Sequence, residues 1–182
     1  GAMTNAATAP LLVYVIPYRT GIAIERETLL TLAAHPRIRG IKDCGGDMAK
    51  TRALIADGRL QVLAGEDAQM FATLAEGGAG AIAASAHLRT ESFVQVLRLL
   101  AAGRLAEARA AWRPLLPLIE ALFSDPNPGP LKAALAAQGL MQDELRSPMT
   151  RVPPERLGRL LAALGVLNRP CRAGRRRLRC LR

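Results

Sequence analysis

A lysine at the end of a short apolar run is the first candidate for chemistry in this chain. Residues 38–42 predict a buried β-strand that ends at Lys42, and the Gly45-Gly46 turn after it leads to Asp47, which can cap a helix beginning at Met48. Burial disfavours the charged form of an ammonium group, and a neutral amine can attack a carbonyl carbon to form a Schiff base. We therefore expect Lys42 to be a nucleophile. The alternative is a strand-end lysine whose ammonium extends into solvent.

The rarity of lysine in this chain favours the interpretation of Lys42 as a nucleophile. The chain has three lysines among its 25 basic residues, and the other 22 are arginines. Arginine stays protonated and cannot form an imine, so a lysine at this place supplies chemistry that an arginine does not.

Strand-loop-helix units must position this lysine. Apolar runs predict strands at 11–17, 38–42, 60–64 and 79–85, and helical patterns follow them at 27–34, 48–56, 68–76 and 91–102. The first run is almost entirely apolar, as in a parallel strand covered on both faces, and residues 18–21 after it are expected to form a loop. Four such units indicate a parallel α/β fold, either a barrel or a doubly wound sheet, in which the loops at the carboxyl ends of the strands carry the chemistry.

Helices without strands are expected in the rest of the chain. They are predicted at 105–123, kinked at Pro114 and Pro117, at 130–138, and at 154–163, where Pro153-Pro154 marks the start. We divide the chain into a tag remnant and disordered start (1–10), a partial (β/α) barrel (11–103), a C-terminal helical region (104–167) and a basic, disordered tail (168–182).

Most of the net positive charge of the chain lies in its C-terminal segment. The net charge is +10, and the arginines after residue 167 account for seven of these charges. Two interpretations of the tail stay open: a basic arm that contacts phosphates of nucleic acid, or translation of a GC-rich gene past its usual end. We favour the second, so nucleic acid is not expected as a partner.

Cysteine usage and hydropathy point to the cytoplasm. The cysteines Cys44, Cys171 and Cys180 are odd in number and widely spaced, which argues against both a disulfide framework and a zinc site. The sequence has no signal-peptide pattern and no apolar run long enough to span a membrane. We expect a cytoplasmic protein without a membrane partner.

Several groups of residues occur in a recognisable order along the chain. They are Tyr14-Val15-Ile16-Pro17 with Arg19-Thr20-Gly21, Gly40-Ile41-Lys42-Asp43 with Gly46-Asp47, Gly65-Glu66-Asp67-Ala68, and Asn127-Pro128-Gly129-Pro130-Leu131-Lys132. No single group is specific. The ordered set, which covers residues 11–167, resembles the carboxyl-terminal part of the dihydrodipicolinate synthase and N-acetylneuraminate lyase family.

This resemblance implies a fold and a reaction. The fold is a (β/α)8 TIM barrel, of which this chain would hold strands five to eight and the C-terminal helical extension. The reaction is that of a lyase of lysine biosynthesis, which condenses pyruvate with a small aldehyde of the aspartate semialdehyde type through a lysine Schiff base, without a metal or organic cofactor.

The resemblance also implies roles for single residues. Lys42 would form the imine, Tyr14 would carry protons at the reacting carbon, and Arg19 would hold the carboxylate of the second substrate. Gly65 and Ile82 match positions that line the pyruvate pocket.

Two other functions stay open. The Lys42-Asp43 pair, in place of lysine-glutamate, is similar to the aldolases of 2-oxo sugar acids in the same family. A barrel of this kind has about 250 residues, and the resemblance places the threonine pair of the proton relay, a tyrosine from across a subunit interface and most of the lysine feedback site in the absent half. Turnover is therefore expected to be impaired, or the half-barrel is a non-catalytic interaction module. Its open sheet edges and uncovered inner face favour a homo-oligomer.

Overall fold

The computed structural model describes residue 4 and residues 6–167 of the chain. Contacts divide the chain into two compact units, Gly1–Glu120 and Ala121–Arg182. The predicted boundary at residue 103 follows the type of element and stays a prediction. The predicted tail at 168–182 and most of the first five residues lie outside the described residues. No helix in the described part of the chain combines the length and the apolar character that a membrane crossing needs.

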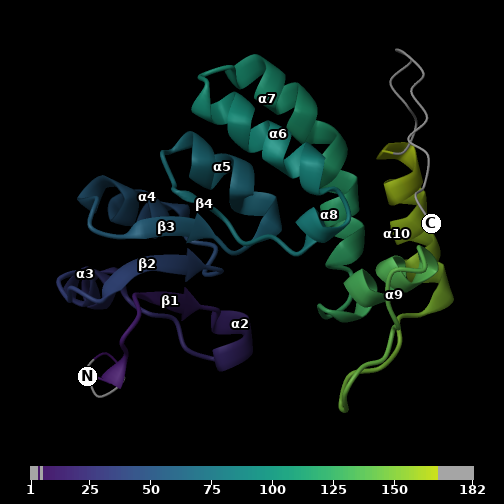
Figure 1. Ribbon diagram of the computed structural model, residues 1–182, viewed down its shortest axis with the longest axis horizontal. Coiled ribbons are helices and arrows are strands. Elements are labelled where there is room, and N and C mark those ends of the chain that lie inside the picture. The colour runs from purple at the N-terminus through teal and green to yellow at the C-terminus, as the bar shows by residue number, and fades with distance from the viewer. Residues whose placement is uncertain (1–3, 5, 168–182) are drawn as a thin grey trace. The chain divides into compact units, whose positions relative to one another are not determined.

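A parallel sheet is the framework of the first unit (Figure 1). Its strands lie side by side in chain order: β1 (Leu11–Val15), β2 (Ile38–Asp43), β3 (Gln61–Ala64) and β4 (Gly80–Ala81). Helices follow each strand: α2 (Pro17–Thr20) and α3 (Arg26–Ala33), then α4 (Met48–Asp57), α5 (Met70–Ala75), and α6 (Thr90–Ala101) with α7 (Leu105–Trp112). This order confirms the predicted strand-loop-helix units, and it brings the carboxyl ends of all the strands to one edge of the sheet.

The hydrophobic core lies on one face of the sheet, which we call the outer face. Its buried members come from the strands, from α3 and α4 and from the segments beside them: Val15, Leu29, Ala33, Ile38, Ile41, Leu54, Leu60 and Val62. On the opposite, inner face of β1, Leu12 is 54% and Tyr14 51% exposed. The prediction that the first strand is covered on both faces is therefore wrong, because the buried core cluster of the described residues lies on the outer face and alternate side chains of β1 stay in contact with solvent.

Two segments differ from their predicted form. Residues 18–21, predicted as a loop, contribute to the helical turn α2, which begins at Pro17 and ends at Gly21 with φ 71°. The fourth strand, predicted over 79–85, pairs only at Gly80–Ala81, and the chain then enters the 3-10 helix η2 (Ser85–His87). Among the described residues β4 has a neighbouring strand on one side only, so the residues after it have no second strand to pair with.

The start of α4 confirms its predicted cap. The Asp47 carboxylate accepts hydrogen bonds from the backbone N–H groups of Ala49 (2.9 Å) and Lys50 (3.0 Å), and Gly58 ends the helix at φ 76°. These backbone hydrogen bonds, above all that from Lys50, hold the pKa of Asp47 below its usual value. The cap fixes the turn that follows Lys42.

Helices without strands follow, as predicted. The predicted helix 105–123 consists of α7, the 3-10 turn η3 (Arg113–Leu115) and α8 (Leu116–Leu122), and the change of helix type occurs at Pro114, which has no N–H to donate. The second unit contains α9 (Gly129–Ala137) and α10 (Pro154–Leu167), which contact each other. Helix α10 begins at the predicted proline and extends past the predicted end at residue 163.

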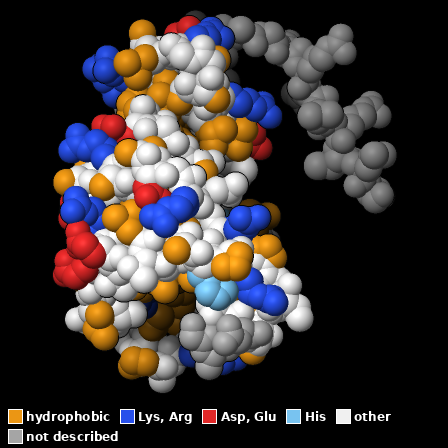
Figure 2. Space-filling model, turned by 90° about the vertical axis from the view of Figure 1, so that its left-hand side faces the viewer, with side chains coloured by type: hydrophobic (Ala, Val, Ile, Leu, Met, Phe, Trp, Pro, Cys, Tyr) orange, Lys and Arg blue, Asp and Glu red, His pale blue; other side chains and the backbone are white. Residues whose placement is uncertain are grey.

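Charges of both signs share the molecular surface. On the face drawn in Figure 2, Lys and Arg side chains are interspersed with acidic and hydrophobic ones. This mixed surface agrees with a sequence in which the excess of arginine lies after residue 167.

Candidate active site

Backbone hydrogen bonds hold the carboxyl ends of the strands together. The Cys44 N–H donates to the Val15 carbonyl (2.8 Å), the Gly65 N–H to the Asp43 carbonyl (2.8 Å), and the Ile82 N–H to the Ala64 carbonyl (2.9 Å). Each bond joins the residue just after one strand to the end of the strand before it. The loops that carry the predicted site residues are therefore fixed side by side.

Lys42 and Tyr14 meet at this edge of the sheet. They are register partners on β2 and β1, so both side chains lie on the inner face. The Lys42 Nζ lies 3.3 Å from the Tyr14 hydroxyl and 4.3 Å from the centre of its ring. Lys42 is half-buried rather than fully buried. An amine beside a phenol can pair imine formation with proton transfer.

The Tyr14 hydroxyl has a second neighbour, the thiol of Cys44. The Cys44 Sγ lies 4.0 Å from that hydroxyl, and the cysteine is buried. Burial raises the pKa of Cys44 to about 11, so it is a neutral thiol near neutral pH. Partial loss of hydration, followed by the nearby Cys44, raises the pKa of Tyr14 above its usual value. Burial and the charge of Asp67 raise the pKa of Glu66, which lies on the next loop.

Two buried carboxylates brace the loops around the site. Asp43, the residue after Lys42, accepts hydrogen bonds from the Gly45 N–H (2.8 Å) and from the Thr51 hydroxyl on α4 (3.0 Å). Asp67 accepts hydrogen bonds from two backbone N–H groups of the β4 loop, those of Ala84 (3.1 Å) and Ser85 (2.6 Å). Both carboxylates accept hydrogen bonds from loop backbone groups, so their role is to fix loop geometry.

We expect Thr51→Val to destabilise the fold by about 2 kcal/mol, because valine has the shape of threonine but leaves the buried Asp43 carboxylate without its hydroxyl donor. The free energy of unfolding in urea measures the effect. Thr51→Ser retains the hydroxyl and is the matched control. Equal unfolding free energies for the valine and serine variants would contradict a role for the hydrogen bond.

The other predicted site residues lie nearby, in different environments. Arg19 is exposed on α2, and its guanidinium carbon lies 5.9 Å from the centre of the Tyr18 ring. Its charge acts to lower the pKa of Tyr14, against the larger effects of burial and Cys44. Ile82 is 45% exposed just after β4. The structure thus brings Lys42 and Tyr14 into contact and leaves Arg19 and Ile82 open to solvent.

Gly65 is a position without room for a side chain. A Cβ there would lie 2.3 Å from the Cys44 Sγ and 3.0 Å from the Lys42 Cγ. The absence of a side chain therefore lets β3 approach the lysine that precedes the turn.

Sequence reasoning did not identify Cys44 and Glu66 as members of this group. The cysteine was considered only as a disulfide or metal ligand, although it follows Lys42 by two residues. Glu66 stands in the loop after β3, at the edge where chemistry was expected. Position in a strand-end loop was the signal that could have identified both.

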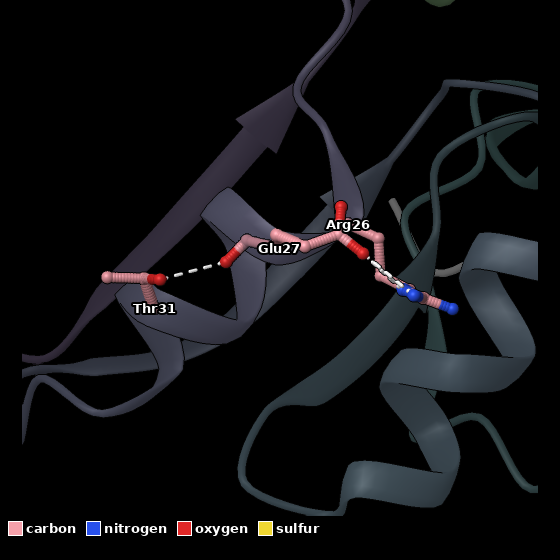
Figure 3. Close-up of polar contacts among 3 residues, drawn as sticks. All are labelled: Arg26, Glu27 and Thr31. Atoms are coloured by element: carbon pink, nitrogen blue, oxygen red, sulfur yellow. Dashed lines mark hydrogen bonds and ion pairs between the residues drawn. The ribbon is translucent and has the colours of Figure 1, made fainter.

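A separate cavity of about 400 Å³ lies beside the turn after β2. It is lined by residues of the α2–α3 connection, the first turn of α3 and the start of α4, among them Arg26, Glu27 and Lys50. Figure 3 shows the Arg26 guanidinium bound to the Glu27 carboxylate, with 2.7 Å between Nη2 and Oε1, and the Thr31 hydroxyl donating to the Glu27 carbonyl. Lys50 is 9% exposed, and its Nζ donates to the Ile24 carbonyl at 3.5 Å. The chain therefore has two shielded lysines in its first unit, and only Lys42 adjoins a phenol.

Comparison with known proteins identifies the family. The sequence pattern of the Dihydrodipicolinate synthetase family matches residues 2–165, which is most of the chain. The chain belongs to this family. A 4-hydroxy-tetrahydrodipicolinate synthase of Limosilactobacillus fermentum is 40% identical over 167 residues, which are 91% of this chain and 53% of that protein. One of Enterococcus faecalis is 38% identical over 165 residues, covering 90% of this chain and 57% of the relative.

Solved structures agree with the family assignment. A dihydrodipicolinate synthase of Thermotoga maritima superposes with a TM-score of 0.87 at 27% identity, over 91% of this chain and 58% of that chain. The chloride-inhibited enzyme of Acinetobacter baumannii, solved in complex with pyruvate, gives a TM-score of 0.86 at 31% identity, over 90% and 57%.

These matches confirm the predicted family and fold class. The parallel sheet with its helices corresponds to part of the TIM barrel of the dihydrodipicolinate synthases. The chain spans about half the length of the curated relatives it matches. The roles of Lys42, Tyr14, Arg19, Gly65 and Ile82 stay predictions.

Proposed function

We propose that this chain carries the imine-forming part of a 4-hydroxy-tetrahydrodipicolinate synthase-type site, which joins pyruvate to a small aldehyde. The Lys42 amine would add to the keto carbon of pyruvate, and the keto oxygen would leave as water, so that a Schiff base forms. The imine would draw electrons from the neighbouring methyl group. Loss of a methyl proton, relayed to solvent through the Tyr14 hydroxyl, would give the carbon nucleophile that attacks the aldehyde.

The contact between Lys42 and Tyr14 carries this proposal. The nucleophile of such a reaction needs a proton donor and acceptor within hydrogen-bonding distance, and 3.3 Å separates the lysine nitrogen from the phenol oxygen. Both residues lie at the carboxyl ends of neighbouring parallel strands, where (β/α)8 enzymes place their chemistry.

The remaining predicted residues would bind substrates. The exposed Arg19 guanidinium would grip the carboxylate of an incoming aldehyde of the aspartate semialdehyde type through two hydrogen bonds. The Gly65 backbone would line the space for pyruvate beside Lys42, and Ile82 would give that space an apolar wall. A 2-oxo sugar acid would form the same imine with Lys42. It would differ from pyruvate only in the carbon chain beyond the imine.

A second candidate function is a non-catalytic interaction module. The exposed Leu12, Tyr14 and Ile82 favour it, because hydrophobic side chains at one edge and face of a sheet are suited to another protein surface. The two candidates differ in one property, which is whether Lys42 reacts with a keto acid.

Trapping with borohydride tests the proposed function. The full chain is incubated with pyruvate and sodium borohydride, and its intact mass is measured, followed by peptide mapping of Lys42, Lys50 and Lys132. We expect a mass gain of one reduced pyruvate on the peptide that contains Lys42. A chain that is folded by circular dichroism and gains no mass would overturn the proposal and favour the interaction module.

A further inference from the structure

Cys44 joins three elements of the candidate site. It follows β2, its backbone N–H donates to the Val15 carbonyl of β1 at 2.8 Å, and its side chain is only 5% exposed. Its Sγ lies 4.0 Å from the Tyr14 hydroxyl, and it occupies the space that a side chain at Gly65 would need. These neighbours enclose the thiol between β1, β2 and the loop after β3.

We infer that Cys44 is a positioning residue of this site, whose thiol holds the Tyr14 hydroxyl beside the amine of Lys42. A catalytic role for Cys44 rests on the proposed function. The family resemblance gave this residue no role, so the inference adds Cys44 to the residues of the site. Tyr14 needs such support because it is 51% exposed. The buried Cys44 thiol, in the loop after β2, supplies a polar contact to the Tyr14 hydroxyl.

The crowding at Gly65 explains why the thiol stays in place. The Gly65 N–H donates to the Asp43 carbonyl at 2.8 Å, which draws the β3 loop against the residue that precedes Cys44. A Cβ at Gly65 would approach the Cys44 Sγ to 2.3 Å. The glycine backbone therefore packs directly on the thiol and keeps it turned toward Tyr14.

Several charged or titratable groups act on the Tyr14 hydroxyl. They are Lys42 on β2, Cys44 after it, Arg19 on α2 and Glu66 after β3. Loss of hydration raises the pKa of Tyr14 most, Cys44 raises it next, Arg19 lowers it, and Glu66 raises it. The charge of Cys44 arises when its thiol ionises at alkaline pH and raises the pKa of Tyr14, so the pKa of Tyr14 should fall when Cys44 is removed.

Titration of the phenol tests this inference without any substrate. The chain has two tyrosines, so in a Tyr18→Phe background the ultraviolet absorbance of phenolate reports Tyr14 alone, and a Tyr14→Phe, Tyr18→Phe double variant assigns the signal. We expect Cys44→Ala to move the titration midpoint to lower pH, and Cys44→Ser, whose hydroxyl stays neutral, to move it in the same direction. Circular dichroism over the same pH range shows that each variant stays folded. A midpoint in the alanine variant that equals or exceeds that of the parent would overturn the inference.

A second measurement separates this inference from the proposed function. With pyruvate, Cys44→Ala should retain the borohydride-trapped adduct, while exchange of the pyruvate methyl protons falls on the order of tenfold to a hundredfold, because the phenol is no longer aligned. Unchanged exchange in that variant would contradict the role of Cys44 and leave the proposed function intact. Absence of the adduct in the parent would contradict the proposed function, and the phenol titration would still decide whether Cys44 holds Tyr14.

Discussion

Replacement of Lys42 by arginine is expected to abolish the pyruvate adduct completely. Arginine keeps the positive charge beside Tyr14 and has a side chain of similar length, so the strand and its neighbours should be little disturbed. Its guanidinium stays protonated and cannot form an imine, so borohydride has no bond to reduce. Intact mass after pyruvate and borohydride should show the mass of the unmodified variant.

Lys132→Arg is the matched control for this experiment. Lys132 lies on α9 in the second unit, where its Nζ donates to the Glu144 carbonyl, and the substitution makes the same change of side chain on another element. The control should retain the full adduct. If the adduct persists in Lys42→Arg, the reactive amine belongs to another lysine. The shielded Lys50, which lines its own cavity, would be tested next.

The Tyr14→Phe variant is expected to separate imine formation from proton transfer. It removes one oxygen atom at a half-exposed position, so the fold and the Lys42 amine should be preserved and the adduct should still form. Exchange of the pyruvate methyl protons should fall roughly a hundredfold to ten-thousandfold, the usual contribution of a positioned acid-base group. Proton NMR in deuterated water follows the exchange directly.

The neighbouring tyrosine provides the control for Tyr14. Tyr18 is 65% exposed on α2, and Tyr18→Phe should exchange the methyl protons as fast as the parent. If Tyr14→Phe also exchanges them at the parent rate, water or another group carries the proton and Tyr14 has no chemical role.

Local sequence patterns predicted much of the fold. Strand periodicity, the Asp47 cap and the Gly58 stop each depend on a few adjacent residues, and the structure has all of them where expected. The errors occurred where a segment depends on partners outside it. The run 11–17 has the composition of a strand buried on both faces, yet burial depends on what packs against it. The length of β4 likewise depends on its pairing with β3, which the residues of β4 alone do not define.

The candidate site, like the fold, was predictable where it depends on local sequence patterns and was missed where it depends on packing between distant segments. Lys42 and Tyr14 lie 28 residues apart in sequence, and the parallel register that aligns them followed from the expected fold. Cys44 and Glu66 were not predicted, because their proximity to the phenol depends on how three loops pack at the edge of the sheet. Sequence spacing defines which strand ends meet, whereas side-chain packing decides which atoms touch.

The alternation of side chains along β1 sets what kind of sequence change this protein tolerates. Val13 and Val15 contact the core, while Leu12 and Tyr14, between and beside them, face the open side. Point substitutions on the open side can therefore alter chemistry without loss of the core. A single inserted or deleted residue within β1 would exchange the two sets, burying a phenol and exposing valines. A library that seeks new substrates should accordingly vary the open positions freely and hold the length of every strand constant.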